Sequence, residues 1–183
     1  MGTQLVILDR DGVINRESAD FIKTADEWQP IPGSLEALAR LHHHGIHVVV
    51  VSNQSGLARG LYDIQALNDI HQKMHRLVHE AGGHIDAVFF CPHGPDEGCE
   101  CRKPRPALFQ QIATRLRVDL ATTPFVGDRL SDVHAARQAG AIPVLVRSGR
   151  YQDNVVNADE LQDVNIYNDL AEFVSAWLEE KND

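Results

Sequence analysis

Short apolar runs alternate with amphipathic segments along most of the chain. The apolar runs are rich in β-branched residues, as in "IHVVVV" at residues 46–51, which is typical of buried strands. The amphipathic segments repeat apolar residues at intervals of three or four, which is typical of helices that pack on one face. We expect strands at residues 4–9, 46–51, 85–90, 123–127, 142–147 and 164–167. We expect helices at residues 33–44, 63–81, 106–117, 130–139 and 168–180.

Residues that favour helix ends support these boundaries. Asp63 is a favourable N-cap, and Pro106 suits the first position of a helix. Gly45 and Gly140 follow two of the predicted helices and can end them. The three consecutive histidines at residues 42–44 are then expected at the solvated end of a helix.

The alternation predicts an α/β protein with a Rossmann-like three-layer fold, in which helices cover both faces of a mostly parallel central sheet. A chain of 183 residues forms one ordinary domain, so we assign residues 1–183 to a single domain. No insertion is long enough for a large cap domain. Only residues 16–32 and the loop at residues 91–106 are available to cover a site.

Polar residues follow the predicted strands. Asp9 ends the first strand, Ser52 and Asn53 follow the second, Cys91 follows the third, and Asp128 follows the fourth. Open parallel sheets place their chemistry at the carboxyl ends of the strands. We therefore expect these side chains to meet at one edge of the sheet.

Four aspartates belong to this edge: Asp9, Asp11, Asp128 and Asp132. Carboxylates this close repel one another unless a cation lies between them or one of them holds a proton. Oxygen ligands of this kind suit a hard divalent cation such as Mg²⁺. A single aspartate at a strand end more often caps a helix, but four of them together favour a metal site.

Basic and hydroxyl residues near the same edge are candidates for holding a phosphate. Ser52 and Asn53 can offer a hydroxyl and a backbone N–H, although this pair is also common in turns. Arg102 and Lys103 follow the third strand and can offset charge on a transferring group, or they form only a solvated basic turn. Arg59 either reaches the same pocket or lies on the surface.

All three cysteines of the chain lie in one loop, "CPHGPDEGCEC". Cys91, His93, Cys99 and Cys101 provide three thiolates and an imidazole, a set that suits tetrahedral structural zinc. A disulfide between Cys99 and Cys101 would be strained and would leave Cys91 without a partner. The loop has almost no apolar residue to pack, so we expect zinc to replace a core and to hold the basic pair that follows.

At this point four ordered motifs, "DRDG", "SN", "RKP" and "GDRLSD", resemble those of the haloacid dehalogenase-like phosphohydrolases. The resemblance covers residues 5 to about 150. The longer stretches "SNQSGLARG" and "CPHGPDEGCECRKP" resemble more narrowly the histidinol-phosphatase-related subfamily, whose members include sugar bisphosphate phosphatases.

The resemblance implies a catalytic role for three residues. Asp9 is expected to attack phosphorus and to form an aspartyl-phosphate. Asp11 is expected to protonate the leaving oxygen and then to activate the hydrolytic water. Lys103 is expected to stabilise the phosphate and the charge of the nucleophile.

The resemblance also implies ligand contacts. Mg²⁺ is expected on Asp9, Asp128 and the backbone carbonyl of Asp11, with Asp132 in a supporting position. The transferring phosphate is expected on Ser52 and Asn53. Arg102, Arg129 and Arg59 are expected to contact the rest of the substrate.

Composition and charge disfavour several classes of partner, although local basic clusters remain possible. The formal net charge of −9 disfavours binding to nucleic acid or to anionic membranes. No apolar stretch approaches the roughly 20 residues that span a bilayer. The N-terminus lacks the pattern of a signal peptide, and clustered cysteines argue against a disulfide framework, so we expect a cytoplasmic protein. No surface stripe demands a dimer, so we expect a monomer.

The sequence thus predicts a Mg²⁺-dependent phosphatase that acts on a small sugar bisphosphate. Three alternatives remain open at this point. Two are enzymes, a histidinol-phosphate phosphatase and a nucleic-acid 3′-phosphatase. The third is a zinc-containing binding module on a degenerate enzyme fold.

Overall fold

Six parallel strands form the central sheet in the order β3-β2-β1-β4-β5-β6. The computed structural model describes residues 4–152 and 159–181. The strands are β1 (Leu5–Leu8), β2 (His47–Asn53), β3 (Ala87–Cys91), β4 (Pro124–Gly127), β5 (Ile142–Val146) and β6 (Asn165–Tyr167). Every neighbouring pair is parallel. The prediction of a mostly parallel sheet is confirmed, and each of the six expected strands is present.

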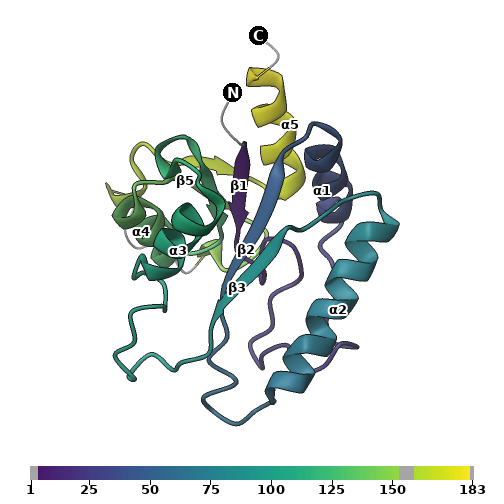
Figure 1. The fold of residues 1–183 in the computed structure, drawn as a ribbon, viewed down its shortest axis with the longest axis vertical. Coiled ribbons are helices and arrows are strands. Elements are labelled where there is room, and N and C mark those ends of the chain that lie inside the picture. Colours follow the sequence, from purple (N-terminus) through teal and green to yellow (C-terminus); the bar gives the residue numbers. More distant parts are fainter. Residues whose placement is uncertain (1–3, 153–158, 182–183) are drawn as a thin grey trace.

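Helices cover both faces of this sheet (Figure 1). One face packs against α1 (Ser34–His43), α2 (Ile64–Glu80) and α5 (Leu170–Glu180). The other packs against α3 (Ala107–Leu116) and α4 (Leu130–Ala139). The three-layer fold predicted from the sequence is confirmed.

The core of the protein follows the alternation of side chains along each strand. In β1, Val6 and Leu8 face the layer of α1, α2 and α5, whereas Leu5 and Ile7 face α3 and α4. Successive strand residues point to opposite faces, so a strand buried on both faces needs a continuous apolar run. This requirement explains why the strands were recognisable as short apolar segments.

The structure extends β2 two residues beyond its predicted end at residue 51. Ser52 pairs with Phe90, and Asn53 pairs with Cys91, in the same register as the rest of the strand. The prediction followed the apolar run, but the backbone ladder continues past the last apolar side chain. As a result, Ser52 and Asn53 are held by the sheet and do not lie in a loop.

The helix ends agree with the capping residues. The Asp63 carboxylate accepts a hydrogen bond from the Ala66 N–H at 2.8 Å, and Gly140 ends α4 with a positive φ of 76°. A short 3-10 helix at Leu120–Thr122 was not predicted. It is too brief for a periodic pattern, and the Asp119 side chain caps it at 2.9 Å from the Ala121 N–H.

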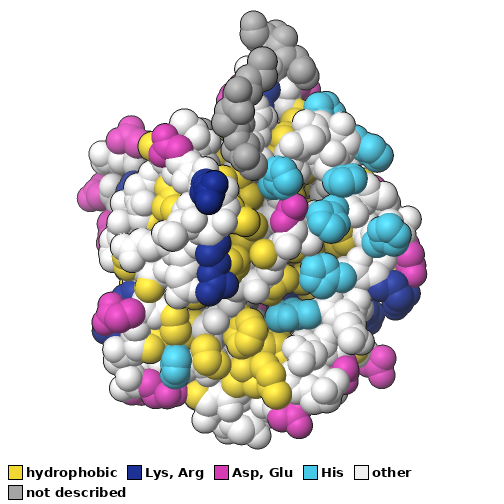
Figure 2. Space-filling view, in the orientation of Figure 1, with side chains coloured by type: hydrophobic (Ala, Val, Ile, Leu, Met, Phe, Trp, Pro, Cys, Tyr) yellow, Lys and Arg dark blue, Asp and Glu magenta, His cyan; other side chains and the backbone are white. Residues whose placement is uncertain are grey.

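The triple histidine lies at the exposed end of α1, as expected. Figure 2 shows histidine side chains gathered on this side of the molecule, over α1 and α2. Within the described residues, no helix is both long and apolar enough to cross a membrane.

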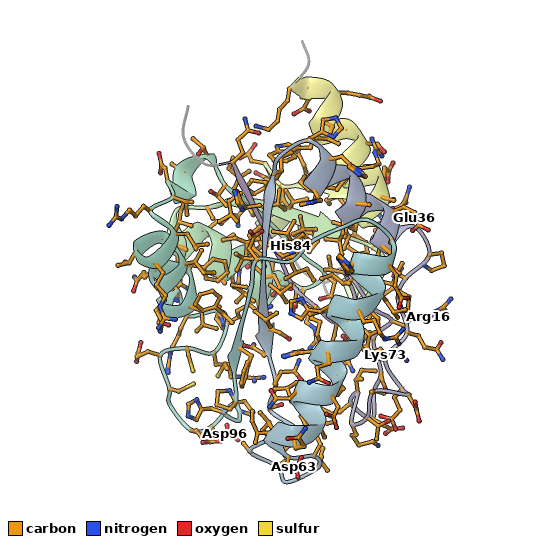
Figure 3. All side chains as sticks on the ribbon, turned by 45° about the vertical axis from the view of Figure 1, so that its right-hand side comes forward. Arg16, Glu36, Asp63, Lys73, His84 and Asp96 are labelled. Carbon is orange, nitrogen blue, oxygen red and sulfur yellow. The ribbon has the colours of Figure 1, made fainter. Side chains whose placement is uncertain are left out.

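The segment between β1 and α1 covers the sheet edge without a helix or strand of its own. Lys73 points to it from α2 (Figure 3) and donates to the carbonyls of Ala25 at 2.7 Å and Trp28 at 2.8 Å. Trp28 belongs to this segment, and its side chain is fully buried. The assignment of residues 1–183 to one domain stays a prediction, and its residues 1–3, 153–158 and 182–183 lie outside the described residues.

Candidate active site

A pocket of about 340 Å³ opens at the carboxyl edge of the sheet. The parallel strands bring their last residues together there, and the Asp9 N–H donates to the Val126 carbonyl across β1 and β4 at 2.9 Å. The pocket is lined by most of the side chains predicted from the sequence, namely Asp9, Asp11, Ser52, Asn53, Arg102, Lys103, Arg129 and Asp132. The expectation that these residues meet at one edge is thus met for this set.

Lys103 lines the pocket and is buried. Its Nζ is 2.8 Å from Asp9 Oδ2 and 2.8 Å from Asp132 Oδ1, and it donates to the Val51 carbonyl at 3.1 Å. Burial opposes the charge on Lys103, but Asp132 and Asp9 together outweigh burial and raise its pKa above the usual value. Lys103 is therefore a fixed cation beside the predicted nucleophile.

Three buried carboxylates, those of Asp9, Asp128 and Asp132, have oxygens within 4.8 Å of one another. Burial raises the pKa of Asp9 to about 7, although Lys103 opposes this shift. Burial, Asp132 and Asp9 raise the pKa of Asp128 to about 8. Burial is the main cause of both shifts and the neighbouring carboxylates add to it, and a hard divalent cation fits this all-oxygen donor set.

Asp132 is already committed to protein contacts. Its Oδ1 contacts Lys103, while its Oδ2 accepts from the backbone N–H groups of Asp128 and Arg129, both at 3.1 Å. These contacts fit the supporting position expected for Asp132. They favour Asp9 and Asp128 as the side chains that would hold Mg²⁺.

Two glycines allow the Asp128 carboxylate to lie between backbone segments. A Cβ on Gly12 would be 2.4 Å from Asp128 Oδ2, and a Cβ on Gly149 would be 2.1 Å from the same atom. Any side chain at either position would therefore displace the carboxylate. Glycine is therefore needed at position 12 of "DRDG" for two reasons, the space that the Asp128 carboxylate occupies and the positive φ of 82°.

Asp11 is surrounded by donors. Arg10 Nη2 contacts both of its oxygens at 3.0 Å, Asn15 Nδ2 donates at 2.8 Å, and Gln54 Nε2 donates at 3.1 Å. Burial opposes ionisation, but Arg10, Asn15 and Gln54 outweigh it and lower the pKa of Asp11. The structure therefore holds Asp11 as a carboxylate, which is the form of a general base, whereas the expected first role requires a proton.

Ser52 and Asn53 have different surroundings. Ser52 Oγ accepts from Gln54 Nε2 at 2.7 Å, so its O–H remains able to donate to a phosphate oxygen. Asn53 clamps the backbone of Lys103, with Oδ1 accepting its N–H at 3.0 Å and Nδ2 donating to its carbonyl at 3.2 Å. The Asn53 side chain thus positions the lysine, and only its backbone remains available for phosphate.

Arg59 is exposed and is absent from the residues that line the pocket. Its guanidinium lies 5.8 Å from the centre of the Phe21 ring, and Phe21 itself lines the pocket. The structure therefore places Arg59 against Phe21 of the segment between β1 and α1 (the covering segment), outside the pocket that contains Asp9.

The four predicted zinc ligands form a compact cluster at the end of β3. Cys91 Sγ is 3.6 Å from Cys99 Sγ and 3.1 Å from Cys101 Sγ, and His93 Nδ1 is 3.2 Å from Cys101 Sγ. A tetrahedron with Zn–S bonds of about 2.3 Å has sulfur atoms about 3.8 Å apart, whereas a disulfide needs about 2.05 Å. The donor set fits zinc and excludes a disulfide in this arrangement.

Sequence reasoning passed over several residues of the pocket. Arg10 is buried and contacts Asp11, Gln54 and His71. Glu17 and Arg150 also line the pocket. Arg150 was the most accessible to prediction, because it follows the carboxyl end of β5, the edge at which the other site residues were sought.

Comparison with known proteins supports the family resemblance that the four sequence motifs carry. A model described as haloacid dehalogenase-like hydrolase matches residues 6–76, and one described as HAD-hydrolase-like matches residues 100–173. A Bordetella bronchiseptica protein named D-glycero-beta-D-manno-heptose-1,7-bisphosphate 7-phosphatase is 50% identical, over 97% of this chain and 99% of its own. The chain belongs to the haloacid dehalogenase-like hydrolases.

Other members of the haloacid dehalogenase-like hydrolases resemble the chain over its full length. A Pseudomonas aeruginosa protein with the same name is 48% identical, over 98% of this chain and 100% of its own. The crystal structure of D,D-heptose 1,7-bisphosphate phosphatase from B. bronchiseptica, complexed with magnesium and phosphate, superposes with a TM-score of 0.94. It is 49% identical and covers 97% of this chain and 99% of its own.

Proposed function

We propose that this chain hydrolyses the 7-phosphate of D-glycero-D-manno-heptose 1,7-bisphosphate through an aspartyl-phosphate on Asp9. The observation that carries the proposal is the buried Asp9 carboxylate, 2.8 Å from Lys103, in a pocket built by the family's four motifs. Relatives that are about half identical over nearly the whole chain carry the name of this activity. The chain is accordingly a phosphoric monoester hydrolase, with a place in the heptose biosynthesis that serves the lipopolysaccharide core.

In the first step, an Asp9 carboxylate oxygen attacks the phosphorus of the 7-phosphate. The bond between phosphorus and the oxygen on sugar carbon 7 breaks, and the departing oxygen takes a proton from Asp11. Asp11 must therefore bind this proton as the phosphate dianion enters, because its donors favour the carboxylate in the free protein. Lys103 offsets negative charge on the phosphoryl group, while the Ser52 hydroxyl and the Asn53 backbone N–H bind its oxygens.

In the second step, water attacks the phosphorus and gives its proton to Asp11, which is now a carboxylate. The bond from phosphorus to Asp9 breaks, inorganic phosphate forms, and the Asp9 carboxylate is restored. The donors around Asp11 stabilise its ionised form, so they favour this step.

Asp9, Asp128 and the backbone carbonyl of Asp11 would hold Mg²⁺. When bound, the cation supplies positive charge that offsets the repulsion among these carboxylates and the incoming phosphate. The raised pKa values of Asp9 and Asp128 support a cation at this position.

Zinc on Cys91, His93, Cys99 and Cys101 would be structural, because four protein donors leave no open ligand position. The loop continues directly into Arg102 and Lys103, which both line the pocket. We assign Arg102 and Arg129 to substrate binding, and Arg59 to support of the covering segment through Phe21. The expected monomer, the cytoplasmic location and the absence of nucleic-acid or membrane partners stay predictions.

A phosphate-release assay with Mg²⁺ tests the proposed function. The substrates are both anomers of D-glycero-D-manno-heptose 1,7-bisphosphate, histidinol phosphate and a 3′-phosphorylated oligonucleotide. We expect the highest kcat/KM for the heptose bisphosphate, with preference for the β anomer because the relatives are named for it. A clear preference for histidinol phosphate or for the oligonucleotide would contradict the proposal.

A further inference from the structure

Histidines gather on one face of the molecule, outside the catalytic pocket. Of the ten histidines in the chain, eight fall between residues 42 and 84. Figure 2 shows histidine side chains close together beside α1 and α2. The proposed reaction uses none of these imidazoles, so their role has to be sought elsewhere.

Asp86 lies among the histidines, directly before β3. Its Oδ1 is 2.7 Å from His47 Nδ1 and 3.9 Å from His84 Nε2. His47 begins β2, whereas His84 follows α2 (Figure 3). One carboxylate oxygen thus lies near two imidazole nitrogens from separate segments, and this combination of ligands suits Zn²⁺ and Ni²⁺.

The sheet holds the Asp86 carboxylate in place. Its Oδ2 accepts from the Val48 N–H at 2.8 Å, and the Asp86 N–H donates to the Val48 carbonyl at 2.8 Å. The His47 N–H donates to the Gln4 carbonyl at 2.9 Å, which fixes the backbone of His47. Oδ1 is therefore left to the imidazoles, and metal-binding carboxylates are commonly held by hydrogen bonds of this kind.

The distances need only a small adjustment to fit a metal ion. Two ligand atoms at about 2.1 Å from a tetrahedral ion lie roughly 3.4 Å apart. The separations of 2.7 Å and 3.9 Å from Asp86 Oδ1 fall on either side of this value. The side chains of His47 and His84 are 51% and 57% exposed, so both rings can turn toward a shared ion without disturbing the core.

Two further histidines surround His84. The ring centre of His42, near the end of α1, is 5.8 Å from that of His84. Burial and, after it, the charge of His84 lower the pKa of His75 on α2. Imidazoles this close oppose the protonation of one another, and the neutral ring is the form that binds metal.

We propose that His47, His84 and Asp86 form a binding site for a divalent transition-metal cation such as Zn²⁺ or Ni²⁺. Solvent supplies the remaining ligands, because both rings are exposed. The site is separate from the Cys/His cluster and from the predicted Mg²⁺ position, and it does not depend on the proposed function.

The proposed site lies at the opposite edge of the sheet from Asp9. His47 and Asn53 are the two ends of β2, which spans about 20 Å at roughly 3.3 Å per residue. A cation bound beside His47 therefore takes no direct part in the chemistry at Asp9. It connects the start of β2 to the loop between α2 and β3.

Calorimetric titration of Ni²⁺ into the zinc-loaded protein, with Mg²⁺ in excess, tests the inference. Zinc then occupies the Cys/His cluster and Mg²⁺ the aspartates, so Ni²⁺ reports on other positions. We expect the wild-type protein to bind one Ni²⁺ per chain. We expect His84→Gln and Asp86→Asn each to weaken binding by about 10-fold or more, since each removes a ligand.

His44→Gln is the matched control. It removes an exposed imidazole from the same face, and His44 Nδ1 already contacts the Arg40 carbonyl at 2.8 Å. We expect its affinity for Ni²⁺ to stay within about threefold of the wild-type value. The unfolding midpoint of each variant shows that it is folded, and Ni²⁺ should raise this midpoint in the wild-type protein more than in His84→Gln.

Three results would overturn the inference. The first is that the wild-type protein binds no Ni²⁺ under these conditions. The second is equal weakening in His44→Gln and His84→Gln, which would assign binding to the histidine-rich face as a whole. The third is unchanged affinity in His84→Gln, which would place the ion elsewhere. None of these measurements needs a substrate, so failure here is distinct from failure of the proposed phosphatase activity.

Discussion

At the scale of single residues, the chemistry depends on the balance of positive and negative charges around Asp9. Lys103 is its cationic neighbour at 2.8 Å, and Asp132 competes for the same ammonium at the same distance. Burial raises the pKa of Asp9 to about 7, so part of the population is protonated at neutral pH when no metal is bound. A protonated Asp9 is a poor nucleophile, which gives Mg²⁺ a role in readying the residue as well as in binding phosphate.

The variant Asp9→Asn separates catalysis from folding. We expect phosphate release to fall by roughly 10³-fold or more, because the amide cannot form the acyl-phosphate. We expect thermal stability to be equal or higher, since the change removes a charge whose burial outweighs its contact with Lys103. Phosphate release and the unfolding midpoint are measured together.

Asp26→Asn is the control, because Asp26 is exposed in the covering segment. A folded Asp9→Asn protein with substantial turnover would contradict the assignment of the nucleophile. Unchanged biological activity of that variant would favour a binding module over an enzyme.

At the scale of elements, the loop after β3 joins the Cys/His cluster to Lys103, the predicted catalytic lysine. Cys101 belongs to the cluster, and Lys103 is two residues further along the chain. The clamp from Asn53 fixes the backbone of Lys103 from the side of β2. The position of the ammonium therefore depends on the sheet and on the folded loop together.

The variant Cys101→Ser tests this dependence. We expect loss of bound zinc and a fall in kcat/KM of about 10-fold to 100-fold, because the loop no longer aims Lys103 although every catalytic group is present. Metal analysis and steady-state kinetics are the measurements. Asp96→Asn is the matched control, since Asp96 lies exposed in the same loop (Figure 3) and outside the cluster. Normal turnover by a protein shown to be free of zinc would refute the proposal.

At the scale of the whole molecule, the buried carboxylates link stability to pH and to Mg²⁺. Asp9 and Asp128 have pKa values near 7 and 8 in the folded protein but about 3.8 when unfolded. Between pH 6.5 and 8 the folded state therefore binds more protons, and stability falls as pH rises. Below pH 6.5 His71 acts in the opposite direction, because burial lowers its pKa to about 4 from 6.5.

Urea unfolding of the zinc-loaded, magnesium-free protein tests this linkage. We expect the free energy of unfolding to decrease from pH 6.5 to pH 8, and the decrease to be smaller in Asp128→Asn. Added Mg²⁺ should stabilise the wild-type protein more at pH 8 than at pH 6.5, because protons compete for the same oxygens. An equal effect of Mg²⁺ at both pH values, or identical slopes for the two proteins, would contradict this account.

Much of this architecture follows from local patterns in the sequence. A strand buried on both faces must be apolar throughout, so its signal is short and clear. Parallel strands bring their carboxyl ends to one edge, so the residues after the strands identify Asp9, Ser52 and Asp128 without any coordinates. The candidate zinc ligands were equally evident, because three thiols and an imidazole lie within eleven residues of a loop that has no core of its own.

Local sequence patterns could not predict which side chains of separate loops would contact one another. The contacts of Asn53 with Lys103, of Gln54 with Asp11 and of Glu17 with Arg150 join positions that are many residues apart. No periodicity records which way a loop side chain points, because that depends on the backbone on which it packs. The sequence by itself determined the elements, the edge of the sheet and the kinds of group that meet there. Only the tertiary structure decided that Asp11 is held as a carboxylate and that Arg129 and Arg150 share one partner, Glu17, since both results come from distances between segments that meet only on folding.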